Sequence, residues 1–159
     1  MKSLLRTLFR FLARQTVRKY RPRIVAIAGS VGKTATKDAI AAGLSSISGG
    51  IRKTQGSFNA EIGVPVTIIA GGKSRTGLGA WFGVVMHALR QLIVRRPFPG
   101  TIVIEMGADK PGDLRELLNI VTPTVGVLTS AAPEHMEFFG DLKAVIAEES
   151  LIVRTLPEG

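Results

Sequence analysis

Residues 24–37 read IVAIAGSVGKTATK, and this stretch decides the fold. Its apolar start is typical of a buried strand, Gly29 and Gly32 mark a tight turn, and residues compatible with a helix follow. In such a turn the backbone N–H groups and the helix N-terminus point at one spot, which suits an anion such as a phosphate. The stretch therefore predicts a strand, a phosphate-binding loop and a helix in succession.

Two side chains of this loop suggest which phosphate compound it binds. The Lys33 ammonium can neutralise phosphate oxygens, and the Thr34 hydroxyl can hold Mg²⁺, so an ATP or GTP site is expected. The spacing departs from the general P-loop pattern, because Ile27 stands where a first glycine would be. The alternative is a tight glycine turn with Lys33 merely solvated. The residues predicted to bind the nucleotide are Gly29, Ser30, Val31, Gly32, Lys33, Thr34 and Ala35.

Length and composition favour one globular domain. The chain has 159 residues, of which 45% are hydrophobic, enough for a sizeable core. It has no cysteine, which excludes disulfides, thiolate metal sites and cysteine nucleophiles. A nucleotide site points to the cytoplasm.

The net charge of +9 is concentrated at the N-terminus. Residues 1–23 hold eight of the 21 basic residues and none of the 12 acidic ones. Residues 1–22 are predicted to form a basic amphipathic helix, in which Arg6, Arg10, Arg14 and Arg18 recur beside an apolar face. The helix either lies on an anionic membrane surface, at the inner face of the membrane, or packs on the domain with its arginines in solvent. It is too short and too often interrupted by arginine to span a bilayer, and no recognition motif for nucleic acid accompanies it.

The remaining chain alternates between apolar runs and helical periodicity. Strands are predicted at 51–55, 101–106 and 124–130, the last two buried, and helices at 33–47, 78–94, 111–121 and 141–155. Residues 57–65 are expected to lead from a loop into a helix, and 71–77 to form a flexible exposed loop. The order predicts an α/β fold similar to P-loop NTPases, with a mostly parallel sheet and helices on both faces.

Ligands of such folds bind at the carboxyl ends of the strands. Glu105 ends one predicted strand, and His135 follows another. Glu105 is predicted to bind Mg²⁺ rather than simply face water, and His135 to contact a ligand or phosphate rather than cap a helix.

Four blocks of sequence, taken together, resemble the ATP-binding central domain of the Mur ligase family. In family order they are AIAGSVGKTATK, SFNAEIGVP, VIEMGADKPGDLREL and VGVLTSAAPEHMEFFG, spread across residues 23–159. The resemblance implies that residues 23–159 are this central domain. It also implies ATP-dependent ligation of an amine to a carboxylate through an acyl phosphate, in the synthesis of a peptidoglycan precursor.

The resemblance also assigns roles to single residues. Lys33 would hold the β- and γ-phosphates, and Thr34 and Glu105 one Mg²⁺. His135 would hold a second ion, and Asn59 would lie near the γ-phosphate or the substrate. Lys33, Glu105 and His135 are the predicted catalytic residues. The substrates implied are a UDP-muramoyl-peptide and an amino acid or dipeptide.

The chain departs from the family in two respects. Glu149 stands where the family often has a carbamoylated lysine; it would supply the same negative charge as a metal ligand, or Glu148 and Glu149 form a solvated helix face. The family's preceding and following domains are also missing, so a truncated chain is expected. The alternatives are a ligase that extends folate or cyanophycin, and a non-catalytic nucleotide-binding domain tethered to a membrane. Nothing resembles a guanine-specificity motif, which disfavours a generic kinase or GTPase.

Overall fold

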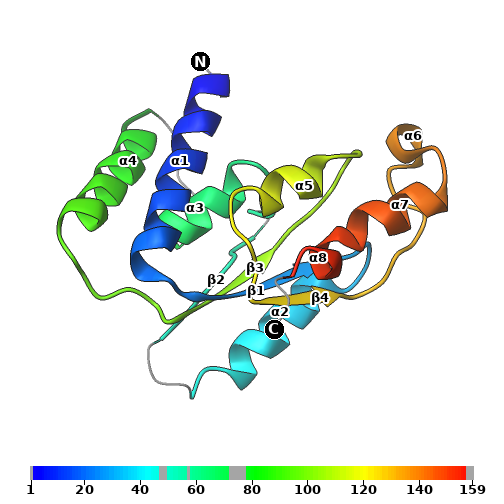
Figure 1. The fold of residues 1–159 in the computed structure, drawn as a ribbon, viewed down its shortest axis with the longest axis horizontal. Coiled ribbons are helices and arrows are strands. Elements are labelled where there is room, and N and C mark those ends of the chain that lie inside the picture. The colour runs from blue at the N-terminus through cyan, green and yellow to red at the C-terminus, as the bar shows by residue number, and fades with distance from the viewer. Residues whose placement is uncertain (1, 47–49, 57, 72–77, 157–159) are drawn as a thin grey trace.

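The structure, a computed structural model, describes residues 2–46, 50–56, 58–71 and 78–156. Apart from Gly71, the loop predicted at 71–77 lies outside these residues. The strands are β1 (Arg23–Ala28), β2 (Ile51–Lys53), β3 (Thr101–Glu105) and β4 (Val125–Leu128). The helices are α1 (Lys2–Tyr20), α2 (Lys33–Gly43), α3 (Gly63–Ala70), α4 (Leu78–Ile93), α5 (Asp113–Leu118), α6 (Met136–Phe139), α7 (Leu142–Glu149) and α8 (Leu151–Arg154) (Figure 1).

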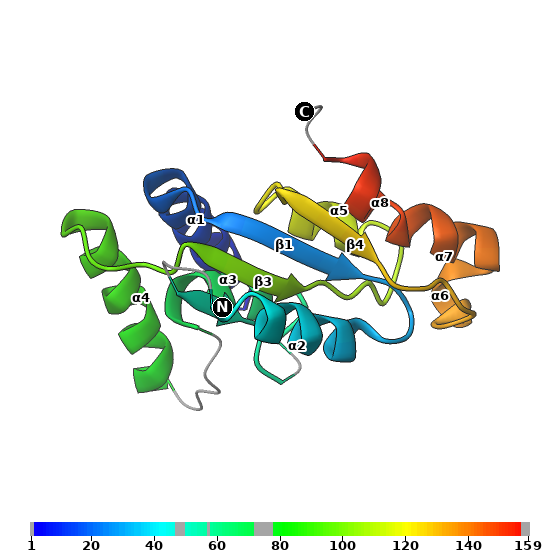
Figure 2. The same ribbon diagram turned by 90° about the horizontal axis from the view of Figure 1, so that it is seen from below.

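The strands form one parallel sheet in the order β2-β3-β1-β4. In its register Ile27 lies opposite Glu105, so the end of β1 and the end of β3 reach the same edge. The strands run side by side in Figure 2, with the loop from β1 to α2 at this edge. The predicted α/β class with a parallel sheet flanked by helices is confirmed.

The two faces of the sheet are covered unequally. Ile24, Ala26 and Ala28 of β1 face the main core, which lies beneath α1, α3, α4, α5 and α8. Val25 and Ile27 face the other way, into a small cluster covered by α2. Because side chains alternate along a strand, the all-apolar run of β1 is what a strand buried on both faces requires.

Two predicted elements differ from the structure. The strand at 124–130 was expected to be buried, but β4 is an edge strand of the described sheet, with Val125 47% and Leu128 37% exposed. Its apolar run packs closely at Gly126, where a Cβ would approach the Ile152 carbonyl oxygen of α8 to 2.3 Å. The helix predicted at 141–155 is divided at Ser150, whose hydroxyl donates to the Ala147 carbonyl at 3.1 Å.

The N-terminal helix α1 packs on the domain. Phe9, Leu12 and Ala13 are fully buried or nearly so, and α1 contacts α3 and α4. The Phe9 ring lies 5.5 Å from the Trp81 ring of α4. Of the two predicted alternatives, the structure therefore has the packed helix. Within the described residues, no helix is both long and apolar enough to cross a membrane.

The arginines of α1 were expected in solvent, and Arg6, Arg14 and Arg18 are exposed, but three of the four arginines also make contacts within the domain. Arg6 pairs with Glu61 at 2.6 Å, and Arg10 pairs with both Glu61 and Glu116. Arg14 donates to the carbonyl at position 119 at 2.8 Å. The basic stripe therefore ties α1 to α5 and to the loop before α3.

Candidate active site

The phosphate loop is held against the segment that follows β4. Gly29 and Gly32 have φ angles of 128° and 89°, which residues other than glycine rarely adopt. A Cβ on Gly29 would lie 2.3 Å from the Thr129 hydroxyl oxygen and 2.7 Å from the Ser130 carbonyl oxygen. Glycine at position 29 thus serves both the turn and the close approach of two backbones.

The loop amides divide into two groups. The N–H groups of Gly29, Ser30 and Val31 donate to Glu149, to the Ser130 carbonyl and to the Ser130 hydroxyl, at 2.7, 2.8 and 3.0 Å. The amides of the next residues, 32–35, begin α2, where helix geometry leaves N–H groups without intrahelical partners. The first group anchors the loop, and the second is open to an anion.

Lys33 is half-buried rather than merely solvated. Its ammonium donates to the Gly29 carbonyl and, at 3.0 Å, to the Ser30 carbonyl, so it folds back over its own loop. The alternative of a solvated Lys33 is therefore wrong. The ammonium lies at the mouth of the loop, where it can exchange these carbonyl oxygens for phosphate oxygens.

Glu105 points into the loop rather than into water. Its carboxylate is 4% exposed and accepts a hydrogen bond from the Thr34 hydroxyl at 3.0 Å. The same oxygen pairs with the Lys37 ammonium at 3.4 Å, and Lys37 itself is only 3% exposed. The sequence analysis missed Lys37. It lies one helical turn beyond Lys33 and Thr34, and this spacing could have pointed to it.

Thr54 was also missed. Its buried hydroxyl accepts from the Glu105 amide at 3.1 Å, which fixes the end of β3. Asn59, predicted near the substrate, lies beside this strand end. Its carbonyl accepts from the Gly107 amide at 2.9 Å, and a Cβ on Gly107 would lie 3.1 Å from the Asn59 side-chain nitrogen. Asn59 thus contacts Gly107, which is two residues beyond Glu105 at the end of β3.

Glu148 and Glu149 do not form a solvated helix face, so that alternative is wrong. Glu148 accepts from the Leu114 amide at 2.8 Å, and Glu149 from the Gly29 amide at 2.7 Å. Both side chains are buried. Burial raises the pKa of Glu149, although the Gly29 hydrogen bond and the Lys33 charge oppose it. Glu149 is the carboxylate that anchors the start of the phosphate loop.

His135 lies directly before α6, in the segment that follows β4. Its φ is 50°, a left-handed conformation that a residue other than glycine adopts only where its surroundings hold it there. Its imidazole is 43% exposed and lies 3.5 Å from the Asp109 carboxylate, which the sequence analysis did not single out. Asp109 follows β3 by four residues, so position after a strand end was the available signal.

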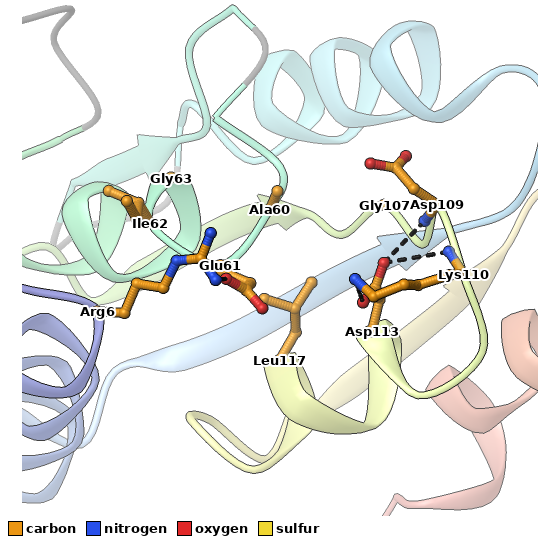
Figure 3. A pocket seen from close by; sticks show the side chains of 10 residues that line it. All are labelled: Arg6, Ala60, Glu61, Ile62, Gly63, Gly107, Asp109, Lys110, Asp113 and Leu117. Carbon is orange, nitrogen blue, oxygen red and sulfur yellow. Dashed lines mark hydrogen bonds and ion pairs between the residues drawn. The ribbon is translucent and has the colours of Figure 1, made fainter. Parts of the chain in front are cut away.

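The cavity beside β3 has a volume of about 330 Å³. Figure 3 shows Arg6 and Glu61 at one end and Lys110, Asp109 and Asp113 at the other, with Leu117 between them. Gly107 also lines the cavity, which therefore begins next to the end of β3. Three elements far apart in the sequence meet there: α1, the segment before α3, and the loop from β3 to α5.

The predicted metal ligands form three separate groups. Thr34 contacts Glu105, Glu149 contacts Gly29, and His135 contacts Asp109. Among the described residues, no three His, Asp or Glu side chains are grouped closely enough to hold a metal ion. The hydroxyl of Thr34 and the carboxylate of Glu105 nevertheless fit Mg²⁺, which takes one or two protein oxygens and completes its shell with phosphate and water.

This arrangement defines the class of the protein. A parallel sheet, a glycine loop between its central strand and a helix, and a carboxylate at the neighbouring strand end are the parts of a P-loop nucleotide-binding domain. Residues 27–159 match the Mur ligase middle domain. The chain therefore belongs to the Mur ligase family.

Relatives and solved structures agree with this assignment. The chain is 30% identical over 148 residues to the UDP-N-acetylmuramoyl-tripeptide--D-alanyl-D-alanine ligase of Haemophilus influenzae, covering 91% of this chain and 27% of that protein. It is 30% identical over 136 residues to the ligase of the same name from Escherichia coli, covering 86% of this chain and 25% of that protein. The MurF ligase of Thermotoga maritima in complex with ADP superposes with a TM-score of 0.72 at 28% identity, covering 100% of this chain and 31% of that one. The chain thus spans about a quarter of the length of these curated relatives.

Proposed function

We propose that this chain is the ATP-binding part of an enzyme that joins an amine to a carboxylate on a peptidoglycan precursor. The contact between Thr34 and Glu105 carries the proposal, because it places a hydroxyl and a carboxylate together at the opening of the phosphate loop. The names of the relatives and the ADP in the Thermotoga structure support the same function. They also favour the cell-wall branch over a ligase that extends folate or cyanophycin.

In this proposal the nucleotide phosphates lie over the first turn of α2. The amides at 32–35 donate to phosphate oxygens, and the Lys33 ammonium leaves the Gly29 and Ser30 carbonyls to bind the β- and γ-phosphates. Thr34 and Glu105 would hold Mg²⁺, which screens the charge between the phosphates and an approaching carboxylate. His135 would hold a second ion. Glu149, in the place of a carbamoylated lysine, is proposed to contribute negative charge from behind the loop.

The reaction proposed is a phosphoryl transfer followed by an acyl transfer. A carboxylate oxygen of the substrate attacks the γ-phosphorus, the bond to the β–γ bridging oxygen breaks, and ADP leaves. The amine nitrogen then attacks the acyl carbon, inorganic phosphate leaves, and the nitrogen gives up a proton. Asn59 positions the substrate, and no protein group becomes covalently attached, so the residues act by orientation and charge neutralisation.

The proposed substrates are a UDP-muramoyl-peptide and an amino acid or dipeptide, as the relatives' names indicate. The proposed compartment is the cytoplasm, because the reaction consumes ATP. The chain spans about a quarter of the length of these relatives, so the first property to assay in it is nucleotide binding.

Isothermal titration with ATP and Mg²⁺ tests the nucleotide site. Lys33→Ala removes the ammonium at the loop and is expected to weaken ATP binding by about tenfold or more. Lys143→Ala is the matched control, because Lys143 is exposed on α7. Equal affinity of the wild type and the Lys33 variant would contradict the assignment.

A peripheral contact with an anionic membrane is a second proposal, supported by side chains that the packed α1 leaves exposed. Leu4 is 76%, Leu8 38% and Phe11 55% exposed, and they recur at helical spacing. The neighbouring helix α4 exposes Phe82 and Ile93. Sedimentation with vesicles containing phosphatidylserine should be lost after Leu4→Ser/Phe11→Ser substitution; unchanged binding by that variant would end this proposal.

A further inference from the structure

We propose that the cavity beside β3 binds a peptide-like group with both an ammonium and a carboxylate, and that Arg6 binds the carboxylate and Asp109 the ammonium. The inference rests on the proposed function and names the part of the substrate that this chain recognises. Arg6 lies on the N-terminal helix α1, which precedes residues 27–159, the part that matches the family model.

At one end of the cavity, the Arg6 guanidinium has more N–H donors than its ion pair with Glu61 requires. Its pair with Glu61, at 2.6 Å, is made through Nη1, and the Arg6 side chain is 48% exposed. A guanidinium has five N–H donors in a planar fork that matches a carboxylate. In Figure 3 the Arg6 side chain reaches the cavity from α1 alongside Glu61. It can therefore keep Glu61 and accept a second carboxylate.

The other charges of the cavity leave one anion uncompensated. Lys110 is paired with Asp113 at 2.8 Å, and this hydrogen bond raises the pKa of Lys110. Glu61 is paired with both Arg6 and Arg10. Asp109 remains: its side chain is 75% exposed, and its carboxylate lies 3.5 Å from the His135 imidazole. This carboxylate suits a ligand ammonium.

Between the two ends the lining is apolar. Leu117, which is 1% exposed, lies between Arg6 and the Asp109 end, and Ile62 lies beside the Arg6 end, as Figure 3 shows. A volume of about 330 Å³ is at the lower end of the range of small-molecule clefts and suits a group of dipeptide size. Small alkyl side chains of a bound peptide would pack against this apolar lining.

The position of the cavity fits the chemistry proposed above. Gly107 lines the cavity and is two residues beyond Glu105, so a bound peptide would lie next to the proposed phosphate site. Two substrates have the required chemistry: the dipeptide that supplies the amine, and the peptide stem of the muramoyl substrate when it contains a diamino acid. Both are recognised by the same pair of charges.

Titration calorimetry of the 159-residue chain, saturated with ADP and Mg²⁺, tests the inference. The probes are D-alanyl-D-alanine and a UDP-muramoyl-tripeptide that ends in lysine. Arg6→Ala and Asp109→Asn are each expected to weaken binding of one probe by about tenfold or more. Arg18→Ala, further along the same basic stripe, is the matched control and should stay within about twofold. The probe that responds identifies the source of the peptide group.

Further variants separate recognition from folding. Arg6→Lys keeps the charge towards Glu61 but loses the planar fork, so it should fold normally and still bind the probe more weakly. N-acetylated D-alanyl-D-alanine lacks the ammonium and should not distinguish Asp109→Asn from wild type. The inference is overturned if neither probe binds a wild-type chain that binds ADP, or if Arg6 and Asp109 variants bind as wild type does. Failure of the wild type to bind nucleotide would instead contradict the proposed function.

Discussion

Replacing Lys37 with methionine tests how much the buried ion pair of Lys37 and Glu105 contributes to the stability of the fold. Lys37 and Glu105 are 3% and 4% exposed, and their charged atoms lie 3.4 Å apart. Methionine fills a similar volume without charge, so Glu105 keeps its burial and loses its cation. Breaking a buried pair in this way costs about 3–5 kcal/mol. Because the Thr34 hydroxyl still donates to Glu105, we expect the lower end, a loss of about 3 kcal/mol in unfolding free energy.

The assay is urea unfolding at neutral pH without Mg²⁺ or nucleotide. A thermal scan gives a second readout, because such a loss lowers the melting temperature of a chain of this size by roughly 6–12 °C. Lys53→Met is the matched control, since Lys53 pairs with Asp38 at 2.8 Å but the two side chains are 44% and 51% exposed. An exposed pair contributes about 0–1 kcal/mol. The double variant Lys37→Met/Glu105→Gln, which removes both charges, should recover most of the loss.

A loss no larger than that of Lys53→Met would refute the reasoning. It would mean that the Glu105 carboxylate is solvated or protonated without Lys37, and that the two residues do not act as a pair. A double variant less stable than Lys37→Met would refute it equally, because Glu105→Gln removes the buried negative charge that Lys37→Met leaves without its cation.

Two other changes probe the phosphate loop. Gly29→Ala should destabilise the fold by about 2 kcal/mol or more and weaken ATP binding, because its Cβ would lie 2.3 Å from the Thr129 hydroxyl oxygen and the φ is 128°; differential scanning calorimetry and ATP titration measure both. For Glu149, burial raises the pKa of the folded state above the ordinary 4.5, so its contribution to stability is complete below pH 4.5 and is lost as pH rises through the folded value. Glu149→Gln, which does not ionise, should therefore gain stability relative to wild type as pH rises from about 4.5 in urea unfolding.

The controls for these two changes lie close by in the chain. Gly43→Ala, where a Cβ meets nothing within 4 Å, should leave both stability and ATP binding near wild type. Glu137→Gln makes the same change at an exposed position and is the control for the substitution itself. A tolerated Gly29→Ala would contradict the close packing of the loop, and a flat pH profile for Glu149→Gln would contradict the burial effect.

The sequence alone was sufficient for the parallel sheet, the phosphate loop and the acid at the end of β3. These rest on short-range rules: an apolar run forms a buried strand, glycines allow the turn, and parallel strands end at one edge. Glu105 was found for this reason, since it directly follows the run that becomes β3. The strand at 124–130 was correctly placed but wrongly expected to be buried, because hydrophobicity does not tell an edge strand from a central one.

Tertiary structure decided which side chains meet. Glu149 reaches the Gly29 amide across 120 positions of sequence, and Arg6 reaches Glu61 from a helix that a sequence pattern could equally place on a membrane. Lys37 turns inward to Glu105 because α2 lies flat over that strand end. Such contacts depend on how helices pack on the sheet. Helical spacing puts Lys37 on the face of Lys33 and Thr34, but only the packing of α2 shows that its partner is Glu105.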